Sequence, residues 1–307
     1  MTTNFSNLRV FCEYLVRKHG EPNEVSEEQL AEDFRTVYLK GLPLNLTTLK
    51  AAAASCGIKL SALEKMPQNV RGYHEVYGEN QSIYFRRGDA LSGIENTILH
   101  EIREMMEALF AEVQPSYAPL RTSARHIAAN HFAAAVLLPA SDFQKKIYDT
   151  GFNVIELSTL YSKSCSQVLL RMGEVMQGRL FMYAALYEPD AENQWRVTYW
   201  TGCSNDTDLD ANVYGGASLF PRRGRAVVPG SLVDLVIQMR KPHLAQHITL
   251  LDSPDEDGLV AIARPLVVSG VPVKVALVVL LEQNRDLLLP QIERSKPVIV
   301  EGFHRHL

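Results

Sequence analysis

The chain has 307 residues, enough for two domains with separate hydrophobic cores. Apolar residues make up 46% of it and charged residues 21%, which excludes a disordered or fibrous chain and is typical of globular proteins. The net charge of −4 excludes an overall attraction to nucleic acid and leaves only a local basic patch for that role.

Membrane and disulfide-rich classes are also disfavoured by the sequence. The N-terminus lacks a basic-then-apolar signal segment, and no apolar run is long enough to span a bilayer. Four cysteines are scattered without Cys-x-x-Cys spacing: Cys12, Cys56, Cys165 and Cys203. We expect reduced, mostly buried thiols in a cytoplasmic protein without membrane contact.

The first ninety residues predict helices followed by strands. Helices are expected at residues 5–20, 26–40 and 45–54, with Ser26 and Gln29 forming a capping box and Asn45 or Thr47 capping the third. A short strand at 58–60 precedes a hairpin-like pair with its turn at 78–80. His74 and Tyr84 fall on that pair, and we expect ordinary half-exposed strand residues there.

Residues 94–110 predict an amphipathic helix that carries the main candidate site. Its apolar residues form one broad arc: Ile98, Leu99, Ile102, Met105, Met106, Leu109 and Phe110. His100 and Glu104 lie off that arc, one turn apart, so an imidazole and a carboxylate can converge on a metal ion. Glu101 lies beside them and could take a proton from water at that ion. The alternative is a solvated face.

The next predicted helix, residues 123–138, offers a third ligand. It is almost wholly apolar after Arg125, which predicts burial on most sides. His126 and Asn130 are four residues apart and share a stripe. His126 is either a hydrogen-bonded core histidine or a ligand that reaches His100 and Glu104, whereas His131 points about 100° away from that stripe.

Together these segments resemble the ImmA/IrrE metallopeptidase family. The matching text is "SIYFRRGDALSGIENTILHEIREMMEALF" followed by "RHIAANHFAAAVLLP", and the resemblance extends over roughly residues 45–178. It implies a zincin-like fold in which His100 is a zinc ligand and Glu101 the catalytic base. Glu104 occupies the position of the family's second His, and His126 that of its Glu ligand, four before Asn130. Asn130 is expected to support the ligands from behind.

The departure from the family pattern is a swap of ligand types. The family uses two His and one Glu, and His100, Glu104 and His126 are again two imidazoles and one carboxylate. Zinc accepts that set with an open fourth position for water, and manganese is a possible substitute. The resemblance therefore implies a metalloendopeptidase with a variant His-Glu-x-x-Glu motif.

Residues 151–178 predict a helix-turn-helix-like connector with its break at 162–164. It would either bind DNA or pack against the peptidase core. Its second helix carries only Arg171 as a basic residue, with Lys163 in the turn. A recognition helix usually has more positive charge, so we favour packing, and direct nucleic-acid binding is not expected.

From residue 179 to 307 the pattern changes to strands with interposed helices, which predicts an α+β sensor module. The module resembles a GAF domain, and the order of domains resembles that of IrrE-type regulators. A loop at 205–231 could cover a small-molecule pocket. His243 and His247 fall on a predicted strand and are expected to be structural, and residues 284–299 to close the chain as a helical region.

The sequence thus predicts an α+β protein with a zinc-peptidase-like domain (1–150), a connector (151–178) and a GAF-like domain (179–307). Family resemblance implies site-specific cleavage of a partner transcriptional repressor in response to a stress or ligand signal. The alternative is a metal-free regulator that binds protein or DNA and senses a ligand through its C-terminal domain.

Overall fold

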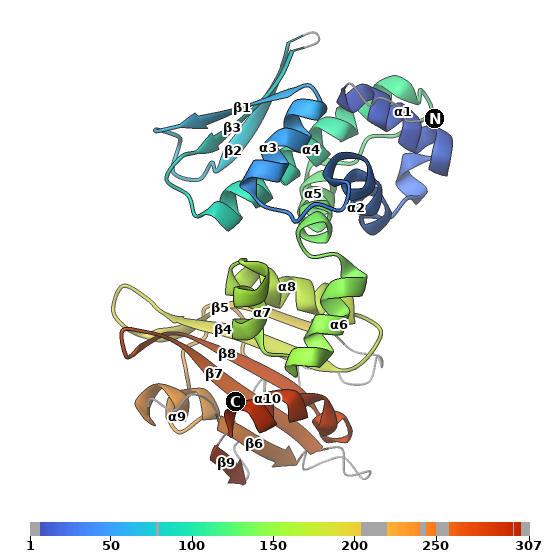
Figure 1. Cartoon of the computed structure of the whole chain (residues 1–307). Coiled ribbons are helices and arrows are strands. Elements are labelled where there is room, and N and C mark those ends of the chain that lie inside the picture. Colours follow the sequence, from blue (N-terminus) through green and yellow to red (C-terminus); the bar gives the residue numbers. More distant parts are fainter. Residues whose placement is uncertain are drawn as a thin grey trace. The chain divides into compact units, whose positions relative to one another are not determined.

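The computed structural model describes residues 7–77, 80–203, 220–239, 244–249, 258–296 and 298–301. The chain forms two compact units, Met1–Ala140 and Ser141–Leu307. Both units combine helices with a sheet, so the predicted α+β class is confirmed (Figure 1). The boundary between the units lies after Ala140. Residues 141–150, predicted as the end of the first domain, and residues 151–178, predicted as a connector, therefore belong to the second unit.

The N-terminal unit begins with helices whose caps follow the sequence closely. Asn7 caps the first helix, Ser26 and Gln29 form a capping box on the second, and Asn45 caps the third. The bounds are α1 (Leu8–His19), η1 (Pro22–Glu24), α2 (Glu27–Phe34), η2 (Arg35–Leu39) and α3 (Leu46–Ser55).

A small sheet follows, made of β1 (Ile58–Leu63), β2 (Gly72–Tyr77) and β3 (Asn80–Arg86). Its order is β1-β3-β2, with β1 parallel and β2 antiparallel to β3. Strand β2 therefore lies at an edge of this sheet. The sheet leads into the two longest helices of the unit, α4 (Leu91–Val113) and α5 (Thr122–Leu137), which pack against each other.

Helix α5 is less buried than its composition predicted. From Phe132 onward the helix is mostly buried, but His126, Ile127, Asn130 and His131 before that point are exposed. Alanine is the commonest residue of this helix, and its small side chain does not require burial on every face. The exposed part carries the candidate ligand.

The C-terminal unit is a sheet with helices on both faces (Figure 1). Its helices are α6 (Ala140–Thr150), α7 (Val154–Tyr161), α8 (Cys165–Met176), α9 (Leu232–Met239), η3 (Glu282–Leu288) and α10 (Leu289–Ser295). Its strands are β4 (Met182–Pro189), β5 (Trp195–Cys203), β6 (Leu244–Thr249), β7 (Gly258–Val268), β8 (Val271–Leu281) and β9 (Val298–Glu301), in the order β5-β4-β8-β7-β6-β9. All pairs are antiparallel except β6 with β9.

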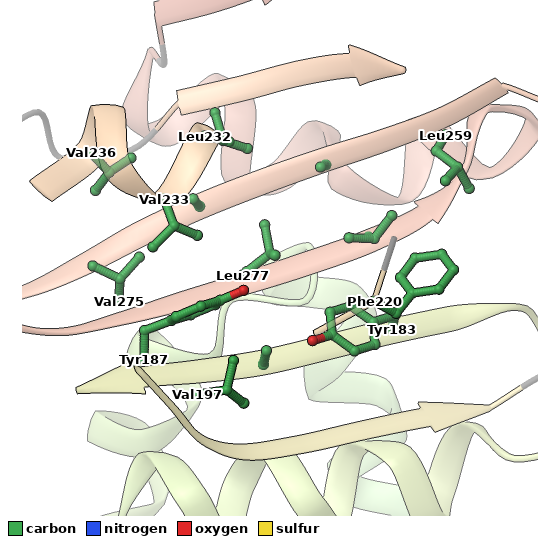
Figure 2. Close-up of a cluster of buried hydrophobic side chains, with 14 of the residues drawn as sticks. Tyr183, Tyr187, Val197, Phe220, Leu232, Val233, Val236, Leu259, Val275 and Leu277 are labelled. Carbon is green, nitrogen blue, oxygen red and sulfur yellow. The ribbon is translucent and has the colours of Figure 1, made fainter. Parts of the chain in front are cut away.

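One face of this sheet is covered by α9 and carries a hydrophobic core. Figure 2 shows Leu232, Val233 and Val236 of α9 above the sheet residues Tyr187 and Leu277, and all of them are buried. The strands of this sheet begin at Met182, in agreement with the predicted change of pattern near residue 179, but the compact unit also contains α6, α7 and α8. The finer GAF assignment depends on the resemblance alone.

The predicted closing helix over 284–299 is wrong at its end. Lys296 takes a left-handed conformation that ends α10, and Val298–Glu301 pairs with β6 as strand β9. The β-branched residues Val298, Ile299 and Val300 favour an extended strand over a helical turn. His247 falls on β6 as predicted, whereas His243 and residues 204–219 of the predicted loop lie outside the described residues.

Helices α7 and α8 form the predicted helix-turn-helix pair, with Ser162 left-handed in the turn. Helix α8 packs on β4 and β5, and a Cβ built on Gly173 would lie 1.8 Å from Thr201 Oγ1. Arg171 is buried, so it is not displayed as a recognition helix would display it. A structural role was predicted with the peptidase core as the packing partner, and the structure has the sheet of the C-terminal unit in that place.

Candidate metal site

Helix α4 is buried on almost every side, including the side that carries its charges. Arg103 is 3% exposed, Glu104 8% and Glu107 1%. The alternative of a solvated face is therefore wrong. Buried charges are retained when they are paired or bind a metal, so each of these residues requires a partner.

Arg103 and Glu107 find their partners in a buried network. Arg103 Nε and Nη2 donate to the Glu27 carboxylate at 2.8 Å, and Nη1 donates to Glu107 Oε2 at 2.9 Å. The Tyr117 hydroxyl and the Leu120 amide both donate to Glu107 Oε1 at 2.6 Å. The network joins α4 to α2 and to the segment that leads into α5, which fixes where α5 begins.

The same network shifts the ionisation of its members. Burial alone would lower the pKa of Arg103, but its hydrogen bonds with Glu27 and Glu107 outweigh burial and raise that pKa. Burial alone would raise the pKa of Glu107, but hydrogen bonds from Tyr117, Leu120 and Arg103 outweigh it and lower that pKa. Both residues are therefore held in their charged forms.

Glu104 is not part of this network and faces two histidines instead. Its Oε1 lies 3.3 Å from His100 Nε2 and 2.5 Å from His126 Nδ1. The two imidazole nitrogens lie 3.3 Å from each other. The structure thus brings together three donor atoms from the residues that the sequence predicted as zinc ligands.

These donor atoms fit a metal ion. Ligands about 2.0–2.2 Å from a tetrahedral zinc are roughly 3.3–3.6 Å apart, which matches two of the three separations. The third requires the His126 ring to move by roughly 0.8 Å or more, and its side chain is 53% exposed and can do so. Glu104 Oε1 is buried without a well-formed hydrogen bond, and its nearest polar neighbours are the two imidazoles that could share an ion with it.

Asn130 holds the ring of His100 from behind. The His100 Nδ1 atom lies 3.0 Å from Asn130 Oδ1. When Nδ1 carries the proton and donates it to this oxygen, the lone pair of Nε2 is left for a metal. The structure thus gives Asn130 a contact with His100, one of the proposed ligands.

Arg125 supplies positive charge at the edge of the site. Its Nε lies 3.7 Å from Glu104 Oε2, and the arginine side chain is 38% exposed. At that separation and exposure the pair is weak and contributes little to holding Glu104.

Glu101 has a partner that the sequence analysis missed. Its Oε2 lies 2.7 Å from Nδ1 of His74, which was expected to be an ordinary strand residue. Strand β2 comes this close to α4 because Gly72 has no side chain: a Cβ there would lie 2.2 Å from Thr97 Cγ2. A glycine two residues before a histidine on an edge strand was the available signal.

Glu104 belongs to two groups of possible metal ligands in the described part of the chain. One is His100, Glu104 and His126, and the other is His74, Glu101 and Glu104. In each group the donor atoms lie within 4.8 Å of one another. His131 is in neither group and is exposed on α5, as the predicted helical spacing requires.

The structure also bears on the predicted state of the cysteines and on the predicted lack of membrane-spanning segments. Cys12, Cys56, Cys165 and Cys203 are free and buried, as predicted. Within the same residues, every helix is too short or too polar to cross a membrane.

Comparison with known proteins identifies a shared fold. No family model matches the sequence, and no curated protein matches it. The solved structure of a Mycobacterium tuberculosis transcriptional regulator matches 97% of this chain and 88% of that chain. The TM-score is 0.56 and the sequence identity 14%, so the similarity concerns the fold. Both units of the chain thus recur together in a protein described as a transcriptional regulator.

Proposed function

We propose that the chain is a zinc-dependent endopeptidase that cleaves a partner transcriptional repressor at one site. The observation that carries this proposal is the convergence of His100 Nε2, His126 Nδ1 and Glu104 Oε1 beside the buried carboxylate of Glu101. Two imidazoles and one carboxylate form a ligand set of zinc hydrolases, although here the positions of the second His and the Glu are exchanged.

The chemistry divides between the ion and the protein. When bound, zinc supplies a Lewis acid that lowers the pKa of water and polarises a peptide carbonyl. Glu101 takes one proton from the attacking water while the water oxygen bonds to the carbonyl carbon. Glu101 then passes that proton to the leaving nitrogen as the C–N bond breaks.

The local geometry suits Glu101 for this role. Its side chain is 11% exposed, and His74 Nδ1 holds its Oε2. This contact leaves the other oxygen for proton transfer and limits rotation of the carboxylate. Restricting a catalytic group to one orientation lowers the barrier because less freedom is lost at the transition state.

Two separate similarities support a transcriptional repressor as the substrate. The fold is similar to that of a transcriptional regulator, and the segments around the site resemble a family whose members cut repressors. The C-terminal α+β unit would then act as a GAF-like sensor of a small ligand and control cleavage. Manganese is a second candidate ion, since imidazole and carboxylate also bind it.

The experiment is cleavage of the repressor encoded by a neighbouring gene. Purified chain with zinc should cut it into two fragments, and a chelator should stop the reaction. Intact repressor that nevertheless binds the chain would overturn the peptidase proposal. That result would favour the metal-free scaffold, in which the first unit binds protein and the second senses a ligand.

A further inference from the structure

The three residues His74, Glu101 and Glu104 form a second group of possible metal ligands, next to the first. His74 comes from the edge strand β2, and the two glutamates come from successive turns of α4. His74 Nδ1 and Glu101 Oε2 are already 2.7 Å apart, and all three donor atoms lie within 4.8 Å of one another. Glu104 is common to both groups.

Two carboxylates and three imidazoles gather in the two groups, which share Glu104. Glu101 and Glu104 are both 8% exposed, so two carboxylates lie in a site that excludes most water. Their neighbours are imidazoles, and the guanidinium of Arg125 lies 3.7 Å from Glu104. A carboxylate has two oxygens and can accept a separate ion at each of them.

We propose that a second divalent cation binds His74, Glu101 and Glu104, with the Glu104 carboxylate shared between the two ions. The binding itself does not depend on any catalytic activity. The second site has one imidazole and two carboxylates, a more oxygen-rich set than the first, and such sets suit zinc or manganese.

The second ion binds more weakly than the first. Its entry breaks the hydrogen bond between His74 and Glu101, and it shares Glu104 with an ion already bound. Two cations that share one carboxylate also repel each other. We therefore expect the two sites to fill in sequence as the concentration of metal rises.

The consequence for regulation rests on the proposed function. When Glu101 is a ligand of the second ion, the positive charge of that ion lowers the basicity of the carboxylate, so Glu101 takes a proton from water less readily. Excess divalent metal should therefore inhibit cleavage that a first equivalent of the same metal supports. The chain would act as a peptidase only within a window of metal concentration.

The test is isothermal titration calorimetry, in which Zn²⁺ alone is added to the metal-free protein. The samples are the unaltered chain, three variants and one control variant. The unaltered chain should bind one tight and one weak equivalent. His74→Ala should weaken the second by at least about tenfold, since even outer partners of metal sites contribute this much, and should leave the first unchanged. His126→Ala should lose the tight equivalent, and Glu104→Ala should lose both.

His131→Ala is the matched control, because His131 is exposed on α5 and belongs to neither group. It should bind both equivalents as the unaltered chain does. Retention of the tight equivalent in His74→Ala shows that this variant is folded. In a cleavage assay, excess Zn²⁺ should inhibit the unaltered chain more strongly than His74→Ala.

The outcomes separate this inference from the proposed function. A tight equivalent without a weak one, or a weak one that survives in His74→Ala, overturns the second site and leaves the peptidase proposal intact. Absence of the tight equivalent in the unaltered chain overturns the proposed zinc peptidase instead.

Discussion

His74 Nδ1 lies 2.7 Å from Glu101 Oε2, and this contact joins the edge strand of the small sheet to the helix that carries the candidate ligands. It gives Glu101 a fixed orientation beside His100 and Glu104. Because His74 belongs to β2, a change in how this strand packs would also change the orientation of the Glu101 carboxylate.

Glu101→Gln separates catalysis from metal binding. The substitution keeps the size of the side chain but removes its ability to take a proton. Loss of general-base help typically costs about 10²- to 10⁴-fold in rate, so cleavage of the repressor should fall by that factor. The tightly bound first ion should be retained, because Glu101 is not one of its ligands.

Glu112→Gln provides the matched control on the same helix. Glu112 pairs with Arg9 at the surface, and its side chain is 55% exposed. Cleavage by this variant should equal that of the unaltered chain. Full cleavage by Glu101→Gln in the same assay would show that Glu101 is not the base.

Asn130→Ala should weaken zinc binding without removing a ligand. Asn130 Oδ1 lies 3.0 Å from His100 Nδ1, and loss of such a partner typically costs about 10- to 100-fold in metal affinity. Competition with a chromophoric chelator measures this affinity. An unchanged dissociation constant would mean that the orientation of His100 does not depend on Asn130.

Gly72→Ala should destabilise the N-terminal unit. The added Cβ would lie 2.2 Å from Thr97 Cγ2 and 2.8 Å from the Tyr84 carbonyl oxygen, and such overpacking typically costs about 1–3 kcal/mol. Gly88→Ala is the control, because nothing lies within 4 Å of the Cβ built there. Faster hydrogen exchange of β2 and α4 amides in Gly72→Ala alone is expected, and equal exchange in both variants would contradict the close packing.

Glu107→Gln should reduce stability in a pH-dependent way. Glu107 is 1% exposed and its pKa is lowered in the folded chain, so its charged form stabilises the fold above its unfolded pKa of about 4.3. At neutral pH the loss should be roughly 1.5–3 kcal/mol, the range for hydrogen bonds to charged groups. The difference should shrink as pH falls below about 4.3.

The probe for that measurement has to report on the N-terminal unit. The chain has two tryptophans, Trp195 and Trp200, and both lie in the C-terminal unit. Hydrogen exchange of α4 amides is therefore the suitable measurement for Glu107→Gln, with tryptophan fluorescence as a separate record of the other unit. A stability difference that stays constant from pH 7 to pH 3 would contradict the lowered pKa.

Local signals predicted much of the fold. The capping residues Ser26 and Asn45 act on neighbouring backbone, so their positions define helix starts without tertiary information. The spacing of His100 and Glu104 is likewise a property of one helix. His126 was an open candidate from its own helix, and the family resemblance connected it to them, because residue spacing within one helix does not encode how two helices pack.

The remaining features depend on contacts between distant segments. The burial of Arg103 and Glu107 follows from Glu27 and Tyr117, which are far away in the sequence. The role of His74 follows from the close approach of Gly72 to α4. Strand β9 forms because β6 offers an edge, which periodicity at residues 284–299 does not indicate.

The most direct test of the account is the zinc content of the chain purified without added metal. The unaltered chain should carry about one tightly bound zinc, held by two imidazoles and one carboxylate. His126→Ala should lose it, because one of three protein ligands is gone, whereas His131→Ala should keep it. A properly folded, unaltered chain that binds no zinc even when zinc is supplied would contradict the central claim.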